Sequence, residues 1–196
     1  MDDDVERTLR ADPTMATLID RHGRLAVEPA DDGFRRLCVS IVNQQLSTAS
    51  AAAIRERAFA VLDDEVSPER VLAADADRLR DAGLSETKVA YLRAAARAFE
   101  ERDLTRGALA DADDEAVVAE LTTITGVGEW TARMYLLFAL GSEDVLPLGD
   151  LAVRRGLEAL YNDGEELSRA EMREIAEAWR PYRSYGTRYV WAAYEP

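Results

Sequence analysis

Residues 121–155 read LTTITGVGEWTARMYLLFALGSEDVLPLGDLAVRR, and this stretch decides how the rest of the chain is interpreted. Gly126 and Gly128 are separated by one residue, and glycine adopts backbone angles that other residues avoid. A helix that ends near Thr123 can therefore turn sharply into an amphipathic helix that begins at once. The second helix would present unpaired backbone N–H groups, which suit a phosphate oxygen. The same pattern is compatible with an ordinary packing joint between helices.

The end of the stretch places Asp150 after Gly149 and before a further amphipathic segment. The partial positive charge at a helix N-terminus favours an ionised carboxylate at such a position. An Asp there is more often an N-cap than a catalytic group. Asp150 is therefore a candidate catalytic carboxylate with a plain structural alternative.

Helical periodicity dominates the remaining sequence. Apolar residues recur at helical spacing from Phe34 to Val42, and capping residues open helices at Ser67-Pro68 and at Ser168. We expect one helix from Pro68 to Ala82. The polar triplet Asn43-Gln44-Gln45 is compatible with a solvated turn or with a functional loop. No segment alternates convincingly with period two, so the sequence predicts an all-α chain of roughly nine or ten helices.

The charge balance argues, taken plainly, against a nucleic-acid partner, because the formal net charge is −14 and the isoelectric point is about 4.6. However, Lys88 is the only lysine among 24 basic residues. An acidic, arginine-rich composition is typical of a salt-adapted, halophilic protein, and charges are screened within about 3 Å at 1 M salt. A nucleic-acid binder of this kind would depend on short-range hydrogen bonds more than on counterion release.

Cysteine and histidine each occur once in the chain, which excludes several kinds of site. Cys38 and His22 are the only residues of their types, which excludes an internal disulfide, a four-cysteine zinc site and a four-cysteine iron–sulfur cluster. No apolar run approaches the roughly 18 residues of a membrane span, and no charged-then-apolar leader opens the sequence. We therefore expect a soluble, unexported, cytoplasmic chain without a membrane partner.

Four collinear segments carry a family resemblance. LTTITGVGEWTA followed by LPLGDLAVRRG resembles the helix-hairpin-helix DNA glycosylase superfamily, and within it the 3-methyladenine DNA glycosylase II family of alkylation repair. IVNQQLS (41–47), GLSETKVAYL (83–92) and WRPYRSYGTRYVW (179–191) are similar to segments of that family. The resemblance implies two helical lobes flanking an active-site cleft. One lobe would cover about 35–142 with the hairpin at 113–140, and the other 1–34 plus 143–196.

The resemblance implies a chemistry for Asp150 and Trp130. Asp150 would stabilise the oxocarbenium-like charge that develops as the glycosidic bond breaks. Trp130 stands where the strand-cutting members carry a Schiff-base lysine, which predicts a monofunctional enzyme that leaves an abasic site. The indole would also attract a cationic flipped base, such as 3-methyladenine or 7-methylguanine. The alternative for Trp130 is a core aromatic residue.

The same resemblance implies the other site residues. Gln45 would fill the gap left by the flipped nucleotide. Further DNA contacts are expected from Asn43, Gln44, Gly126, Val127, Gly128 and Thr131. The base pocket would add Met134, Tyr135, Trp179, Tyr182 and Tyr185. A structural Na⁺ or K⁺ would be held by the backbone carbonyls of Thr122, Ile124 and Val127, with no organic cofactor. The expected partner is double-stranded DNA with damaged bases, bound by a monomer that is associated with the nucleoid when it acts.

Two other functions are compatible with these residues. One is a glycosylase of the same fold that acts on deaminated or oxidised bases. The other is a non-catalytic helix-hairpin-helix DNA-binding module, in which Asp150 would be only a helix cap.

Overall fold

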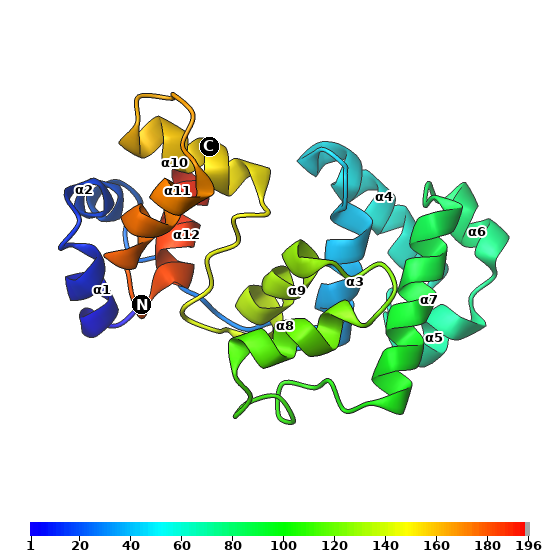
Figure 1. Ribbon diagram of the computed structural model, residues 1–196. Helices are drawn as coiled ribbons and strands as arrows, with labels where there is room; N and C mark the ends of the chain where they lie inside the picture. The colour runs from blue at the N-terminus through cyan, green and yellow to red at the C-terminus, as the bar shows by residue number, and fades with distance from the viewer. Residues whose placement is uncertain (195–196) are drawn as a thin grey trace. The chain divides into compact units, whose positions relative to one another are not determined.

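The computed structural model describes residues 1–194, in which all regular secondary structure is helical and no strand occurs (Figure 1). This confirms the predicted all-α class. The described chain forms twelve α-helices and one π-helical turn rather than the nine or ten helices expected. One reason is that the helix predicted from Pro68 to Ala82 is broken. Ala74 adopts extended angles (φ −63°, ψ 140°), and Asp75 caps a new helix with its carboxylate.

The chain divides into two compact units, residues 1–29 with 141–196 and residues 30–140. The first unit contains α1 (Asp3–Leu9), α2 (Pro13–His22), α10 (Leu151–Tyr161), α11 (Arg169–Glu177) and α12 (Arg183–Tyr194). α12 packs against α2, α10 and α11. Its approach to α10 is close, because a Cβ at Gly156 would lie 2.5 Å from a methyl carbon of Val190. Both ends of the chain thus build one core.

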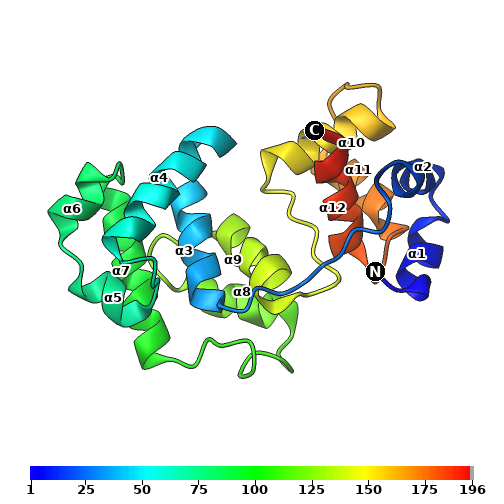
Figure 2. The same ribbon diagram turned by 180° about the vertical axis from the view of Figure 1, so that it is seen from behind.

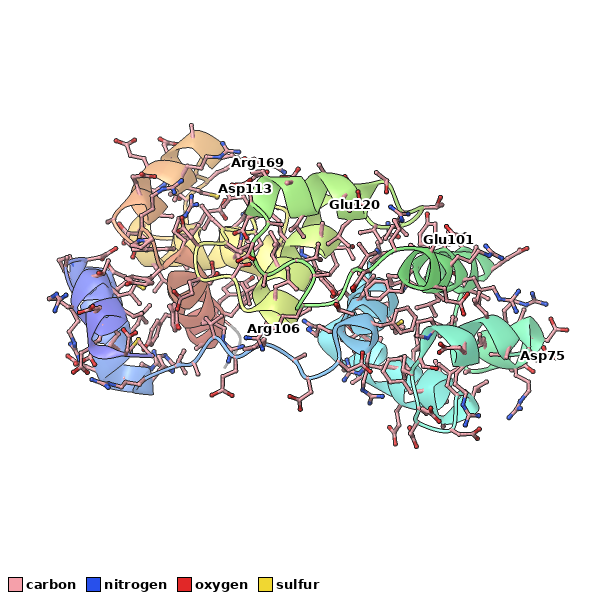
Figure 3. All side chains as sticks on the ribbon, turned by 90° about the horizontal axis from the view of Figure 1, so that it is seen from below. Asp75, Glu101, Arg106, Asp113, Glu120 and Arg169 are labelled. Carbon is pink, nitrogen blue, oxygen red and sulfur yellow. The ribbon has the colours of Figure 1, made fainter. Side chains whose placement is uncertain are left out.

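The second unit is organised around α3 (Gly33–Asn43), which contacts α4 (Thr48–Val61), α7 (Glu86–Glu101), α9 (Glu129–Tyr135) and η1 (Leu136–Leu140) (Figure 2). The short helices α5 (Pro68–Ala73) and α6 (Ala76–Asp81) pack on α7. α8 (Asp114–Thr122) completes the unit by packing against α9. Figure 3 labels Asp113 and Glu120 near the two ends of α8.

The unit boundaries follow 29 and 140, whereas the sequence suggested boundaries after 34 and 142. Residues 30–34 join the second unit because Ala30 donates its backbone N–H to Phe138 O (2.7 Å) and Phe34 packs edge-on against Phe99. None of the described helices combines the length and apolar character of a bilayer span.

Candidate functional site

Asp150 is the N-cap of α10 in the first unit. Its Oδ1 accepts the backbone N–H of Val153 at 3.0 Å and the indole Nε1–H of Trp191 at 3.2 Å. The side chain is half-buried, and Trp191 comes from the far end of α12. Two donors on one oxygen fix the orientation of the carboxylate. The carboxylate is therefore held in place by two separate helices.

The loop before Asp150 is fixed as firmly as the carboxylate itself. Arg154 donates from Nη1 to the carbonyls of Leu148 (2.9 Å) and Gly149 (3.2 Å). On the other side, Ser184 accepts the backbone N–H of Val145 at 2.9 Å. These contacts leave little freedom in the backbone that leads into α10, as a preorganised reacting group requires.

The hairpin between α8 and α9 depends on Gly126. Gly126 has φ +90°, and a Cβ built there would lie 2.0 Å from Cγ of Tyr91 on α7. Only glycine fits this position, for both conformational and steric reasons. Val127 is buried and donates its N–H to Ile124 O at 3.0 Å. The tight turn predicted from the two glycines is therefore present, with Tyr91 packed against it.

α9 begins differently from the other helices. In α1–α8, α10 and α11, an Asp or Ser N-cap accepts backbone N–H groups, whereas Gly128 at the start of α9 provides no side-chain cap. The first N–H groups of an α-helix have no partner within the helix. Space is open where a Cβ of Gly128 would stand. A helix start without a side-chain cap is the kind of position at which an anion can bind.

The polar turn after α3 is joined to the hairpin. Gln44 donates from Nε2 to Gly126 O (2.9 Å) and to Thr131 Oγ1 (3.0 Å). Asn43 Oδ1 lies 3.5 Å from its donor, Arg55 Nη1. Gln45 is exposed and has φ +57°, a left-handed angle that few non-glycine residues adopt. Gln45 is therefore presented outward, while Gln44 is a structural link.

This geometry shows that two of the expected DNA-contacting side chains bind within the protein. The side chain of Thr131 is 2% exposed and accepts from Gln44, so its hydroxyl supports the hairpin from inside. The Gln44 amide is occupied in the same way. A polar residue beside a DNA-contacting loop can thus be part of its support.

Arg36 on α3 and Arg55 on α4 bring positive charge to this unit. Arg36 on α3 lies over the Phe138 ring at 4.2 Å, and burial together with the nearby charge of Arg55 lowers the pKa of Arg36 to about 10. A pKa of about 10 leaves the Arg36 guanidinium protonated at neutral pH. In a chain of net charge −14, this is a local region of the sign that DNA phosphates require.

Two aromatic residues assigned to the base pocket lie in the cores instead. Trp179 is fully buried and donates Nε1–H to Asp12 Oδ2 at 3.0 Å within the first unit. Tyr135 is fully buried and donates its hydroxyl to Leu104 O at 2.7 Å within the second. Each ring packs among residues of its own unit, so neither Trp179 nor Tyr135 is exposed for contact with a base in this structure.

The other pocket candidates differ in their surroundings. Met134 is 4% exposed, and Tyr185 is 6% exposed with its hydroxyl donating to Glu143 (3.0 Å). Burial and that hydrogen bond raise the pKa of Tyr185 to about 12. Met134 and Tyr185 are therefore poorly placed to contact a base. Tyr182 and Trp130 are half-buried and remain candidates.

The sequence profile of the HhH-GPD superfamily of base excision DNA repair proteins matches residues 38–181. The chain belongs to this superfamily. The matched segment includes the polar turn, the hairpin and Asp150, which are the features described above. The resemblance seen in the four sequence segments is thereby confirmed.

Two of the similar proteins are named for the removal of 3-methyladenine from DNA. The DNA-3-methyladenine glycosylase of Saccharomyces cerevisiae is 30% identical over 153 residues, which are 74% of this chain and 52% of that protein. The chain thus spans about half the length of this curated relative. A DNA-3-methyladenine glycosidase of Bacillus halodurans has a TM-score of 0.84 at 32% identity, covering 99% of this chain and 90% of that one.

A third similar protein was solved with DNA. The 3-methyladenine DNA glycosylase of Schizosaccharomyces pombe, in complex with abasic DNA, has a TM-score of 0.87 at 26% identity. The likeness covers 96% of this chain and 95% of that one.

Sequence reasoning missed four supporting residues of this superfamily member: Tyr91, Lys88, Arg154 and Trp191. Tyr91 and Lys88 lie inside the segment 83–92, and Trp191 ends the segment 179–191. Arg154 follows Asp150 by one helical turn, a spacing that could have suggested contact with the helix start. No signal in the sequence connects Trp191 with Asp150, because that pairing depends on how α12 packs.

Proposed function

We propose that the chain is a monofunctional DNA glycosylase that hydrolyses the N-glycosidic bond of alkylated purines and leaves an abasic site. The observation that carries the proposal is the fixed Asp150 carboxylate, bound by Val153 N and Trp191 Nε1. Asp150 lies within the segment matched by the repair superfamily, which makes this helix cap a candidate catalytic group. The names of the similar proteins support 3-methyladenine-type substrates.

The proposed DNA grip uses backbone groups rather than net charge. A phosphate would accept from the uncapped N–H groups at the start of α9, where Gly128 leaves space. Gln45 would enter the base stack from its exposed position. Such short-range contacts suit an acidic chain, since they depend less on counterion release.

The proposed reaction needs little proton transfer to the leaving group. An alkylated purine carries a positive charge, so it departs as a neutral base when the C1′–N bond breaks with both electrons. The sugar becomes oxocarbenium-like, and the negative charge of Asp150 would stabilise it. Water then adds to C1′ and loses a proton, which completes hydrolysis.

A monovalent cation at the hairpin is part of the proposal. Among the suggested ligands, the carbonyl of Ile124 already accepts from Val127 N, but a carbonyl oxygen has a second lone pair. Neutral backbone oxygens suit Na⁺ or K⁺, and the described residues hold no cluster of three acidic, His or Cys side chains for a transition metal. The ion would fix the turn beside Gly126.

The product strand should remain intact until alkali or heat is applied. A Schiff base needs a free amine, and Lys88, the only lysine, donates to two backbone carbonyls. Denaturing gels of end-labelled alkylated duplex, run with and without alkali, check this expectation. Prompt nicking, or trapping of a covalent complex with borohydride, would contradict it.

Replacing Trp130 by alanine should slow the release of cationic bases by about 3- to 30-fold, from a cation–π contribution of about 0.5–2 kcal/mol. Release of a neutral lesion such as hypoxanthine should change less, and Trp130→Phe should retain part of the rate. The measurement is release of each base by chromatography, with Tm recorded in parallel. An equal loss for all bases together with a lowered Tm would assign Trp130 to packing.

The decisive assay measures release from methylated DNA at several salt concentrations and identifies the free bases. Release of 3-methyladenine or 7-methylguanine supports the proposal. Selective release of hypoxanthine or oxidised purines would favour the same fold with another substrate. DNA binding without any release would indicate a non-catalytic module.

A further inference from the structure

Lys88 is half-buried and its ammonium group contacts the polar turn. Its Nζ donates to Val42 O at 2.7 Å and to Gln44 O at 2.8 Å, from the first turns of α7. Val42 is in the last turn of α3, and Gln44 is the C-cap of that helix. A cation at a helix C-terminus satisfies carbonyls that have no partner within the helix.

Gln44 is therefore fixed at two points from two directions. Lys88 binds its backbone carbonyl, and its side-chain amide binds Gly126 O and Thr131 Oγ1 of the hairpin. The next residue, Gln45, has φ +57° and is exposed. A non-glycine residue keeps such an angle only when the surrounding contacts determine it. The hydrogen bonds of the Gln44 carbonyl and of the Gln44 side chain are the contacts that hold the backbone next to Gln45.

We propose that Lys88 is a positioning residue that holds Gln45 in the conformation in which it enters the DNA base stack. The inference rests on the proposed base-flipping function, since it needs Gln45 to intercalate. Lys88 does not contact DNA in this role; it acts through the carbonyl of Gln44. In this proposal the single lysine of the chain positions Gln45 and is not a nucleophile.

A matched control exists on the same helix. Arg93 donates from Nη2 to Ala74 O at 2.8 Å, and Ala74 is the C-cap of α5. Arg93, like Lys88, is half-buried. Lys88→Met and Arg93→Met therefore each remove a cation from a helix end, but only the first lies next to Gln45.

The experiment uses a duplex with a tetrahydrofuran abasic analogue and 2-aminopurine on the opposite strand, whose fluorescence rises when the base is unstacked. With the full chain, Lys88→Met should weaken binding to this duplex about tenfold and remove most of the fluorescence rise. Arg93→Met should change neither, although both variants should lower Tm. Lys88→Arg should restore part of the signal, because it keeps a charged donor.

A double variant tests whether Lys88 acts through Gln45. Gln45→Ala alone should lose the fluorescence rise, and adding Lys88→Met should cause no further loss, because the two effects are coupled. Lys88→Gln serves the same comparison if Lys88→Met does not fold. Identical behaviour of the Lys88 and Arg93 variants, or additive losses in the double variant, would overturn the assignment. Absence of any rise with the wild-type chain would instead count against the proposed function.

Discussion

Asp150→Asn should leave a folded, DNA-binding protein that releases alkylated bases at least about 100-fold more slowly than the wild type. Removing a group that stabilises transition-state charge typically costs about 10²- to 10³-fold in rate. Asparagine is as good an N-cap as aspartate and can still accept from Val153 N and Trp191 Nε1. The variant therefore removes the negative charge and keeps the position.

Asp75→Asn is the matched control. Asp75 is the N-cap of α6, accepts the N–H groups of Asp77 and Arg78, and lies at the periphery of the second unit in Figure 3. Both variants should show an unchanged Tm and unchanged binding to an abasic duplex, and only Asp150→Asn should lose single-turnover release. Full release by Asp150→Asn would refute the proposed mechanism, whatever the fold.

The elements of the fold could be predicted because their signals are local. Ser67 before α5 and the capping box at Ser168 and Glu171 both stand where the structure has helix starts. The break at Ala74 was missed because it depends on the cap that Asp75 supplies to a second short helix. The local sequence is compatible with one long helix or with two short ones. The packing of α5 and α6 on α7 favours the two short helices.

The candidate site was predictable in part for the same reason. Gly126 and Asp150 are determined by turn and cap chemistry, which neighbouring residues reveal. The core positions of Trp179 and Tyr135 depend on Asp12 and Leu104, which are remote in sequence. An aromatic residue in a functional motif gives no indication of which way its ring points, so the sequence could not show that these two rings are buried.

The two hairpin glycines should respond oppositely to the same substitution. Gly126→Ser should lower the free energy of unfolding by about 3 kcal/mol, the sum of a positive-φ cost and an overpacking cost. The physical reason is the Tyr91 ring, whose Cγ would lie 2.0 Å from the new Cβ at φ +90°. For a chain of this size, Tm should fall by about 10 °C.

Gly128→Ser should raise the stability slightly, because Gly128 has ordinary extended angles (φ −88°, ψ 176°), open space for a Cβ and no cap. A serine hydroxyl at the N-cap accepts an N–H group of the first turn and strengthens the helix by a few tenths of a kcal/mol relative to glycine. The same hydroxyl would compete with a DNA phosphate, so the affinity for abasic duplex should fall about tenfold. Thermal unfolding and a binding titration of both variants check the pair. If Gly128→Ser bound DNA as tightly as the wild type, the start of α9 would not be the phosphate site. If Gly126→Ser kept the wild-type Tm, the Tyr91 ring would not restrict the turn.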